Sequence, residues 1–267
     1  MAQFRALHES GCFVLPNPWD RGSAIYLEHL GFKALATTSA GFAFSRGLAD
    51  AAVPLDMMLE HVADISSATS LPVNADFRNG FADEPASVAE SVMLCVATGV
   101  AGLSIEDSSD DKAKPLYDFD LAVERIKAAR AAIDATGVPV VLTARCEAWL
   151  VNQPDPLTVV LERLAAFAEA GADCLYAPGA IKPEDISAIV KTVSPKPVNL
   201  LVSKFNSELT VSQVTDLGVR RISVGSALAA VAWNSFMTAA REIVDKGSFE
   251  NLTHAAVFGE INELFSR

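Results

Sequence analysis

The 267-residue sequence contains few metal-binding side chains, with only four cysteines and four histidines. No two cysteines have CxxC spacing, and the histidines are scattered along the chain, which excludes the usual zinc motifs. Three of the cysteines fall in apolar runs, as expected for reduced, buried thiols, and this pattern favours a cytoplasmic location. The residues concerned are Cys12, Cys95, Cys146 and Cys174, and His8, His29, His61 and His254.

Basic charge is also scarce, because 21 Lys and Arg face 33 Asp and Glu, for a net charge of −12. Without a basic stripe the chain has no means of displacing counterions, so we expect no nucleic-acid partner. No apolar run reaches the roughly 18 residues of a membrane span, and the first residues lack signal-peptide architecture. We therefore expect no membrane partner and a cytoplasmic protein, whose acidity serves solubility.

One pattern recurs along the chain: a helical stretch ends in glycine, and a short apolar run follows within two or three residues. The glycine suits the left-handed residue that ends a helix, and the run suits a buried parallel strand. The segments that show it are EHLGFKALATT, VATGVAGLSIED, DATGVPVVLTAR, EAGADCLYAP and TDLGVRRISVG.

Eight such strand runs alternate with amphipathic helical stretches, which predicts a parallel sheet with right-handed crossovers. Eight units in this length indicate an α/β fold of the (β/α)8 TIM-barrel type, formed by residues 1–267 as a single domain. No GxGxxG follows the first strand, which disfavours a dinucleotide-binding sheet. The predicted strands are 12–16, 34–38, 72–76, 102–106, 140–144, 174–177, 198–201 and 221–224. The clearest predicted helices between them are 23–30, 87–98, 121–135, 158–170 and 186–192.

A C-terminal helical tail begins at about residue 226, with one helix over 226–246 and a second over 252–265. This is more helix than the barrel needs. The tail therefore either packs on a neighbouring subunit, giving a homo-oligomer, or caps its own barrel.

Polar residues follow the predicted strands at the ends where barrel active sites lie. Carboxylates at Asp76 and Glu106, on neighbouring strands, together with the amide of Asn74 predict a hard-oxygen site for Mg²⁺, with Mn²⁺ as the alternative. Strand alternation lets Asn74 and Asp76 face the same way. In the competing interpretation Glu106 or Asp107 only caps a helix.

Arg145 ends the fifth predicted strand and offers a bidentate fork for a substrate carboxylate or phosphonate. The alternative is a salt bridge to Glu147 or Glu106. The segment 39–53, SAGFAFSRGLADAAV, follows the second strand. Its first three residues, Ser39, Ala40 and Gly41, suit a turn whose N–H groups bind a carboxylate, and its remainder is either a mobile lid or a plain surface loop.

These pieces, taken in order, make the chain resemble the isocitrate lyase/phosphoenolpyruvate mutase superfamily over nearly its whole length. The matching segments are PNPWDRGSA, TTSAG, the Asn-Ala-Asp of 74–76, the GxxGLxIED of 99–107 and the TARxEA of 143–148. The resemblance implies a barrel that is commonly oligomeric, as a dimer or tetramer, with its last helix swapped between subunits. It also implies Mg²⁺ and small carboxylate substrates.

By resemblance, Asp76 is the direct metal ligand, and Asn74 and Glu106 act largely through metal-bound waters. The turn of Ser39, Ala40 and Gly41 binds the substrate carboxylate, Arg145 grips the substrate, and Asp50 lies in the gating loop. From its strand position alone, Asn199, near which the seventh strand begins its exit, is a further candidate for substrate binding.

The chain also departs from the superfamily pattern. Asn74 stands where members usually carry a first aspartate, which should weaken the metal site. The cysteine-containing acid/base loop of the lyases is replaced by SSDDKAKPLYDFD, and the corresponding mutase loop is missing too. Cys146 is no replacement, because alternation turns it away from the site. Lys112, Lys114 and Tyr117 are then the candidates for proton transfer in the shortened loop, each of them otherwise a solvated loop residue.

The resulting prediction is a Mg²⁺-dependent carbon–carbon lyase or decarboxylase that acts on a small 2-oxo or 2-hydroxy carboxylate through an enolate. Two alternatives remain. One is C–P bond chemistry of the phosphonopyruvate hydrolase or mutase kind, and the other is a 2-oxoacid-binding protein without catalysis.

Overall fold

The computed structural model describes residues 1–266, and its eight parallel strands form one sheet in the order β1-β8-β7-β6-β5-β4-β3-β2. This order places β1 and β2 at the two edges, and a backbone hydrogen bond between their neighbourhoods nearly closes the barrel. The predicted barrel is therefore confirmed. The strands are β1 (Phe13–Leu15), β2 (Leu35–Ala36), β3 (Val73–Asp76), β4 (Gly102–Glu106), β5 (Val141–Arg145), β6 (Cys174–Tyr176), β7 (Val198–Leu201) and β8 (Arg221–Ser223).

The seam between β1 and β2 has no strand ladder and is joined in another way. The Ala36 N–H donates to the carbonyl of Pro16 at 3.1 Å. The Asn17 side chain donates to the Thr37 carbonyl at 2.8 Å, and its Oδ1 accepts from the N–H groups of Val224 and Gly225. One buried amide thus connects the ends of β8, β1 and β2.

Helices surround the sheet, and the ring is made by α2 (Arg21–His29), α3 (Ser39–Ser45), α4 (Leu55–Ala68), α5 (Pro85–Ala97), α6 (Phe119–Ala135), α7 (Pro156–Glu169), α8 (Pro183–Val193) and α9 (Val211–Asp216). Five of them end as the sequence predicts, with a glycine of positive φ directly after the C-cap: Gly31, Gly99, Gly137, Gly171 and Gly218. The left-handed conformation costs glycine little, so each helix stops there and the next strand begins.

Alternation along the strands separates an apolar outer face from a polar interior. On β4, Leu103 and Ile105 belong to the core packed against the helices, whereas Ser104 and Glu106 are on the opposite face. The N-terminal end of the barrel is covered by α1 (Ala2–Leu7), whose Phe4 is buried in a cluster with Phe13 and Leu15. The interior near the C-terminal strand ends is left to polar side chains.

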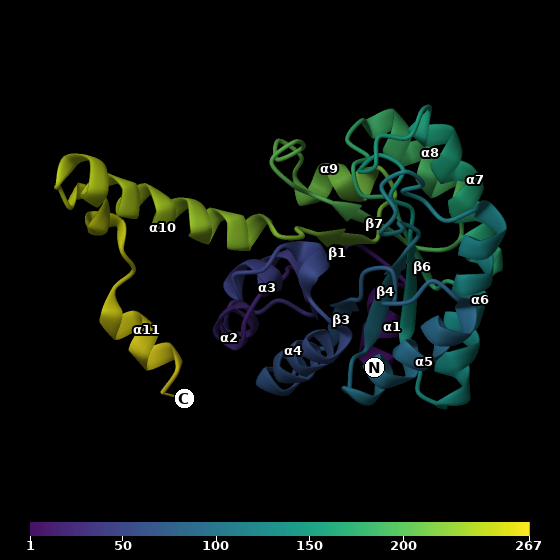
Figure 1. Ribbon diagram of the computed structural model, residues 1–267, viewed down its shortest axis with the longest axis horizontal. Helices are drawn as coiled ribbons and strands as arrows, with labels where there is room; N and C mark the ends of the chain where they lie inside the picture. The colour runs from purple at the N-terminus through teal and green to yellow at the C-terminus, as the bar shows by residue number, and fades with distance from the viewer. Residues whose placement is uncertain (267) are drawn as a thin grey trace.

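Beyond β8, α10 (Ala227–Lys246) extends away from the barrel, followed by the short helices η2 (Glu250–His254) and α11 (Phe258–Leu264) (Figure 1). The predicted helix over 226–246 is confirmed. The predicted single helix over 252–265 is wrong, because an extended segment at residues 255–257 separates η2 from α11. Helix α10 itself does not cap the barrel (Figure 1), whereas Phe265, the C-cap residue of α11, approaches Gly22 of α2, so both interpretations of the tail stay predictions. No helix among residues 1–266 is long and apolar enough to cross a membrane.

Candidate active site

A cavity of about 210 Å³ opens at the C-terminal ends of the strands. It is smaller than the roughly 300–1,000 Å³ of sites for drug-sized ligands, as expected for a substrate of few atoms. Its charged lining residues are Asp50, Asp76, Arg145 and Arg221. Its other polar lining residues include Asn17, Thr37, Thr38, Ser39, Asn74, Ser104, Tyr176, Asn199, Ser223 and Ser226.

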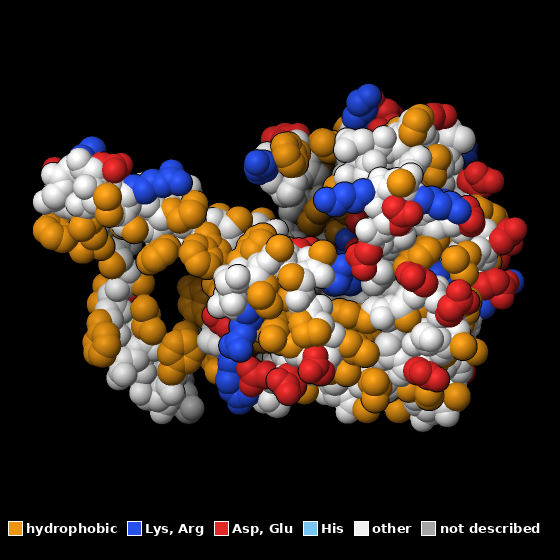
Figure 2. All heavy atoms as spheres, viewed as in Figure 1, with side chains coloured by type: hydrophobic (Ala, Val, Ile, Leu, Met, Phe, Trp, Pro, Cys, Tyr) orange, Lys and Arg blue, Asp and Glu red, His pale blue; other side chains and the backbone are white. Residues whose placement is uncertain are grey.

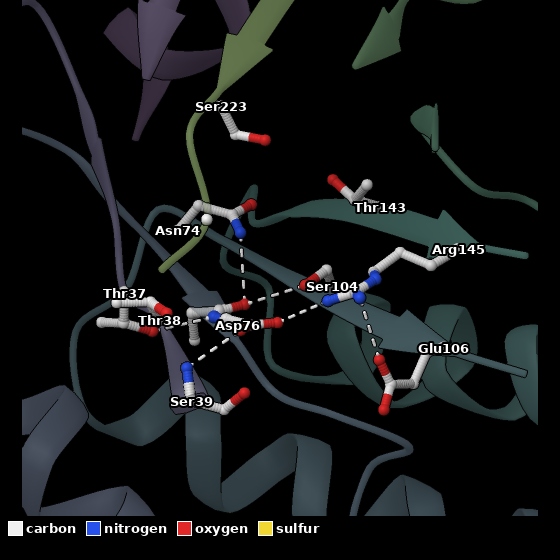
Figure 3. A network of polar contacts seen from close by, with 12 residues as sticks. Thr37, Thr38, Ser39, Asn74, Asp76, Ser104, Glu106, Thr143, Arg145 and Ser223 are labelled. Carbon is white, nitrogen blue, oxygen red and sulfur yellow. Dashed lines mark hydrogen bonds and ion pairs between the residues drawn. The ribbon is translucent and has the colours of Figure 1, made fainter. Parts of the chain in front are cut away.

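Arg145 is the centre of the charge network on one side of this cavity (Figure 3). Its guanidinium lies 2.6 Å from Asp76, 3.1 Å from Glu106 and 2.9 Å from Glu147. Burial acts to lower the pKa of Arg145, but the three carboxylates outweigh it and hold that pKa well above its usual value. Both salt bridges that the sequence offered as the alternative for Arg145 are therefore present, together with a third to Asp76.

Asp76 connects this network to helix α3 (Figure 3). Its Oδ2 accepts the Ser39 N–H at 3.0 Å, and its own N–H donates to the Thr37 hydroxyl at 2.9 Å. Thr38 is the N-cap of α3, where its hydroxyl accepts the Gly41 N–H. The predicted turn of Ser39, Ala40 and Gly41 is thus the first turn of a helix. Ser39 and Ala40 line the cavity, while Gly41 is buried behind them.

The rest of segment 39–53 is more regular than either predicted form, lid or plain loop. Helix α3 continues to Ser45, and η1 (Asp50–Ala52) follows after a short loop. Asp50 is exposed at the cavity mouth, near Asp76. Partial desolvation of its carboxyl and the charge of Asp76 raise the pKa of Asp50, opposed by Ser39 and by the charges of Arg78 and Arg145. The mouth therefore holds two carboxyl groups that repel each other when both are ionised.

The predicted metal ligands lie on neighbouring strands β3 and β4, and their fit to Mg²⁺ can be tested on their free acceptor atoms. Each oxygen of Asp76 receives one donor, so about two of its four lone-pair positions stay available. The Oδ1 of Asn74 is buried and has no hydrogen-bond partner among residues 1–266. No group of three acidic, histidine or cysteine side chains within residues 1–266 is arranged to hold a metal ion by itself. Mg²⁺ uses only one or two carboxylates and keeps several waters, so Asp76, Asn74 and Glu106 fit it.

A second, fully buried ion pair stands behind this wall. Asp107 contacts Arg163 at 3.0 Å and accepts the Glu147 N–H at 2.8 Å. This pair fixes the backbone beside Glu147, which in turn holds Arg145. Neither Glu106 nor Asp107 caps a helix, because the next helix, α6, has Asp118 as its N-cap residue. The capping interpretation is therefore wrong. Cys146 is fully buried, away from the cavity, as alternation predicts.

The shortened loop does not bring its candidate proton-transfer groups to the cavity. Lys112 and Lys114 are exposed, and Lys114 pairs with Asp118. Tyr117 is buried, but its hydroxyl donates to Asp83 and accepts from Asn79. Burial and the bond to Asp83 raise the pKa of Tyr117 to about 12. No contact in this conformation supports either Lys112 or Tyr117 as a proton donor.

The opposite wall of the cavity comes from β6, β7 and β8. Asn199 is placed there as predicted, and its amide donates to the Ser223 hydroxyl at 2.9 Å. Tyr176 and Arg221 also line this wall and were not predicted. Burial raises the pKa of Tyr176 to about 12, so its hydroxyl stays protonated. Strand alternation alone would have found Tyr176, because it is the last residue of β6 and in register with Arg145.

Comparison with known proteins adds a family match over most of the chain. A model for the family described as phosphoenolpyruvate phosphomutase matches residues 4–244. A crystal structure from Burkholderia cenocepacia, provisionally described as a lyase/mutase, is 44% identical with a TM-score of 0.96, over 100% of this chain and 96% of that one. An uncharacterized Mycobacterium tuberculosis protein is 32% identical over 97% of this chain and 94% of its own length. Oxaloacetate acetylhydrolase bound to oxalate is 27% identical with a TM-score of 0.87, covering 98% and 92%.

Proposed function

Because the chain belongs to the phosphoenolpyruvate phosphomutase family, we propose that it is a Mg²⁺-dependent enzyme that cleaves a carbon–carbon bond next to the carboxyl group of a small 2-oxo or 2-hydroxy acid. The observation that carries the proposal is the environment of Asp76. This carboxylate faces a small cavity and has acceptor positions left, and the same cavity is lined by Asn74, whose Oδ1 has no hydrogen-bond partner among residues 1–266. The similarity to oxaloacetate acetylhydrolase supports the same class of substrate.

Asp76 would hold the metal directly, with Asn74 and Glu106 contacting it through waters. When bound, Mg²⁺ supplies a Lewis acid that stabilises negative charge developing on a substrate oxygen. Arg145 keeps Asp76 and Glu106 in place through ion pairs of 2.6 and 3.1 Å, so the carboxylates are oriented before any ligand arrives. At the start of α3 the Ala40 N–H would bind the substrate carboxylate, because the Ser39 N–H already donates to Asp76.

Asp50 is the group best placed to move a proton. Desolvation and the charge of Asp76 raise the pKa of Asp50 and so shift it toward the protonated form, and in that form it would protonate the carbanion or enolate left by bond cleavage. The Tyr176 hydroxyl stays protonated in the cavity wall, so it would donate a hydrogen bond to the substrate without transferring its proton. Proton transfer is therefore assigned to η1 and not to the loop that carries Lys112 and Tyr117.

The proposal is tested by measuring thermal stability with Mg²⁺ against a panel of small acids, followed by product analysis for any acid that stabilises the protein. The panel comprises oxaloacetate, 2-oxoglutarate, pyruvate, isocitrate, methylisocitrate and phosphonopyruvate. We expect one acid to raise the melting temperature only when Mg²⁺ is present. Asp76→Ala should abolish this shift. The exposed Asp120→Ala, on α6, is the matched control and should keep it.

Three outcomes would contradict the proposal in different ways. An increase in melting temperature that needs neither Mg²⁺ nor Asp76 would contradict the proposed metal site. A shift confined to phosphonopyruvate, with release of phosphate, would assign C–P chemistry instead. Metal-dependent stabilisation without any product would leave a 2-oxoacid-binding protein.

We also propose that the protein is a homo-oligomer that assembles through its C-terminal arm, residues 227–264. Exposed apolar side chains line this arm, as the hydrophobic colour along it in Figure 2 shows, and they include Val231, Phe236, Val244 and Phe258. Exposed apolar surface of this kind marks a contact site in soluble proteins.

A further inference from the structure

Arg221 is a buried cation in the wall of the active-site cavity. It is the first residue of β8, its side chain is 2% exposed, and it lines the cavity together with Asn199 and Ser223. Its Nε donates to Oδ1 of Asn199 at 2.8 Å, and its Nη2 donates to the Thr143 hydroxyl at 3.0 Å. Both acceptors are neutral, so these hydrogen bonds orient the guanidinium without balancing its charge.

The remaining polar neighbours of Arg221 do not supply a negative charge either. His8 Nε2 lies 3.4 Å from Nη1, and burial and the charge of Arg221 lower the pKa of His8 to about 4, so the imidazole is neutral. Asp173, the carboxylate whose charge also acts on His8, is shared by Arg5 and Arg130 at 3.1 and 2.9 Å. Within residues 1–266, no carboxylate forms an ion pair with Arg221.

The two arginines of the cavity therefore differ in charge balance. Arg145 is surrounded by three carboxylates, whereas Arg221 has none. A buried charge without a counter-ion is costly. Arg125 is also buried without an ion pair in the described part of the chain, but three backbone carbonyls and the Tyr117 ring surround its guanidinium. Arg221 instead lies beside an open cavity, and this position points to an anionic ligand as its missing partner. Arginine presents several donors in a planar fork and suits a carboxylate best.

We infer that Arg221, with Asn199 and Ser223, forms an anion subsite on the β7–β8 wall that binds a second carboxylate of the substrate. The ligand carboxylate lies against the Asn199 amide and the Ser223 hydroxyl, with the guanidinium beside it. This inference rests on the proposed function and narrows it, because it makes the substrate a dicarboxylate whose other carboxyl group lies at the start of α3. A monocarboxylate would leave Arg221 without a partner.

The test compares two acids that differ only in that group, malate and 2-hydroxybutyrate, by isothermal titration of the full chain with Mg²⁺. The wild type should bind malate about tenfold or more tightly than 2-hydroxybutyrate. Arg221→Met should bring this ratio close to one by weakening malate alone. Arg220→Met is the matched control, since the neighbouring Arg220 turns outward to the Gly11 carbonyl, and it should keep the ratio.

Asn199→Asp provides a second variant that does not depend on removing Arg221. It places a carboxylate where Oδ1 already meets Nε, so the guanidinium gains an internal counter-ion, and the preference for malate should again be lost. An unchanged ratio in both variants, or an equal loss of both acids, would overturn the subsite. If the wild type binds both acids equally, only the subsite fails. If the wild type shows no binding of either acid that depends on Mg²⁺ and Asp76, the proposed function itself fails.

Discussion

Arg145 and Asp76 form an ion pair of 2.6 Å that joins β5 to β3 across the strand between them. The same guanidinium holds Glu106 on that middle strand and Glu147 just beyond β5. Three acidic side chains, of which Asp76 lines the cavity, thus depend on one cation, and this dependence has a measurable consequence for stability.

Arg145→Met should lower the free energy of unfolding by about 3–5 kcal/mol, because it leaves buried carboxylates without a counter-ion. Urea denaturation monitored by circular dichroism measures this change. Arg145→Lys keeps the positive charge but loses the planar guanidinium, so its free energy of unfolding should lie between those of the wild type and Arg145→Met. Arg241→Met, at an exposed position of α10, serves as control. A loss below about 1 kcal/mol for Arg145→Met would contradict the central role of this ion-pair network.

Two histidines, the buried His61 and the partly buried His8, predict that stability falls in acid. Burial lowers the pKa of both His8 and His61 to about 4, and His61 stacks on Phe42 at 3.8 Å with no partner for its Nε2 among residues 1–266. Between pH 6.5 and 4 the unfolded chain binds protons that the folded chain excludes, so stability is complete above 6.5 and is lost as the pH falls. The loss is at most about 3 kcal/mol per histidine.

The variant His61→Phe isolates one of these contributions, because phenylalanine keeps the stack on Phe42 and cannot titrate. The difference in unfolding free energy between pH 7 and pH 4.5 should be smaller in this variant than in the wild type. His29→Gln, at the exposed end of α2, is the control. Equal pH dependence in all three proteins would show that His61 does not contribute.

Gly102 allows the close approach of Asn74 inside the barrel. A Cβ at position 102 would lie 2.7 Å from Asn74 Oδ1 and 2.7 Å from the Phe4 ring, so Gly102→Ala must displace one of them. We expect about 1–3 kcal/mol of destabilisation and a weaker Mg²⁺-dependent ligand shift. Gly259→Ala on α11, where a Cβ meets nothing within 4 Å, should be neutral or slightly stabilising. If Gly102→Ala keeps the full Mg²⁺-dependent thermal shift, Asn74 does not take part in the metal site.

The exposed arm predicts the assembly state. Val231 and Phe236 on α10 are 65% and 63% exposed, so we expect the wild type to sediment as a dimer or tetramer. The double variant Val231→Asp/Phe236→Asp should shift the protein toward the monomer in analytical ultracentrifugation, because the charges oppose burial of that face. Asn234→Asp adds one charge on the same helix as control. A monomeric wild type would refute the proposal.

The barrel and much of its site follow from local patterns in the sequence. Glycine after a helix and alternation within a strand depend only on nearby residues, and parallel strands bring their ends together, so Asn74, Asp76, Glu106 and Arg145 were predicted as neighbours. The extended break at residues 255–257 was missed, since the apolar spacing of the tail continues through it.

Contacts between distant segments could not be obtained in this way. Arg221 lies in a run that the sequence marks only as the eighth strand, and its contact with His8 joins positions 213 residues apart. The role of the loop with Lys112 and Tyr117 was equally undetermined, because the Tyr117 hydroxyl is held by Asn79 and Asp83 from the segment after β3. Loop conformation depends on such partners and not on periodicity.

The seam between β1 and β2 makes the barrel wall uneven in rigidity. A side-chain amide can rotate away without breaking a ladder, so the bonds made by Asn17 should open at a lower free energy than the paired strands elsewhere. The Ala36 amide at this seam should therefore exchange with deuterium before the amides of β4 and β5. Thr37, Thr38 and Ser39 follow directly, so the start of α3, where we propose that the substrate carboxylate binds, lies on the part of the barrel wall that should open most readily.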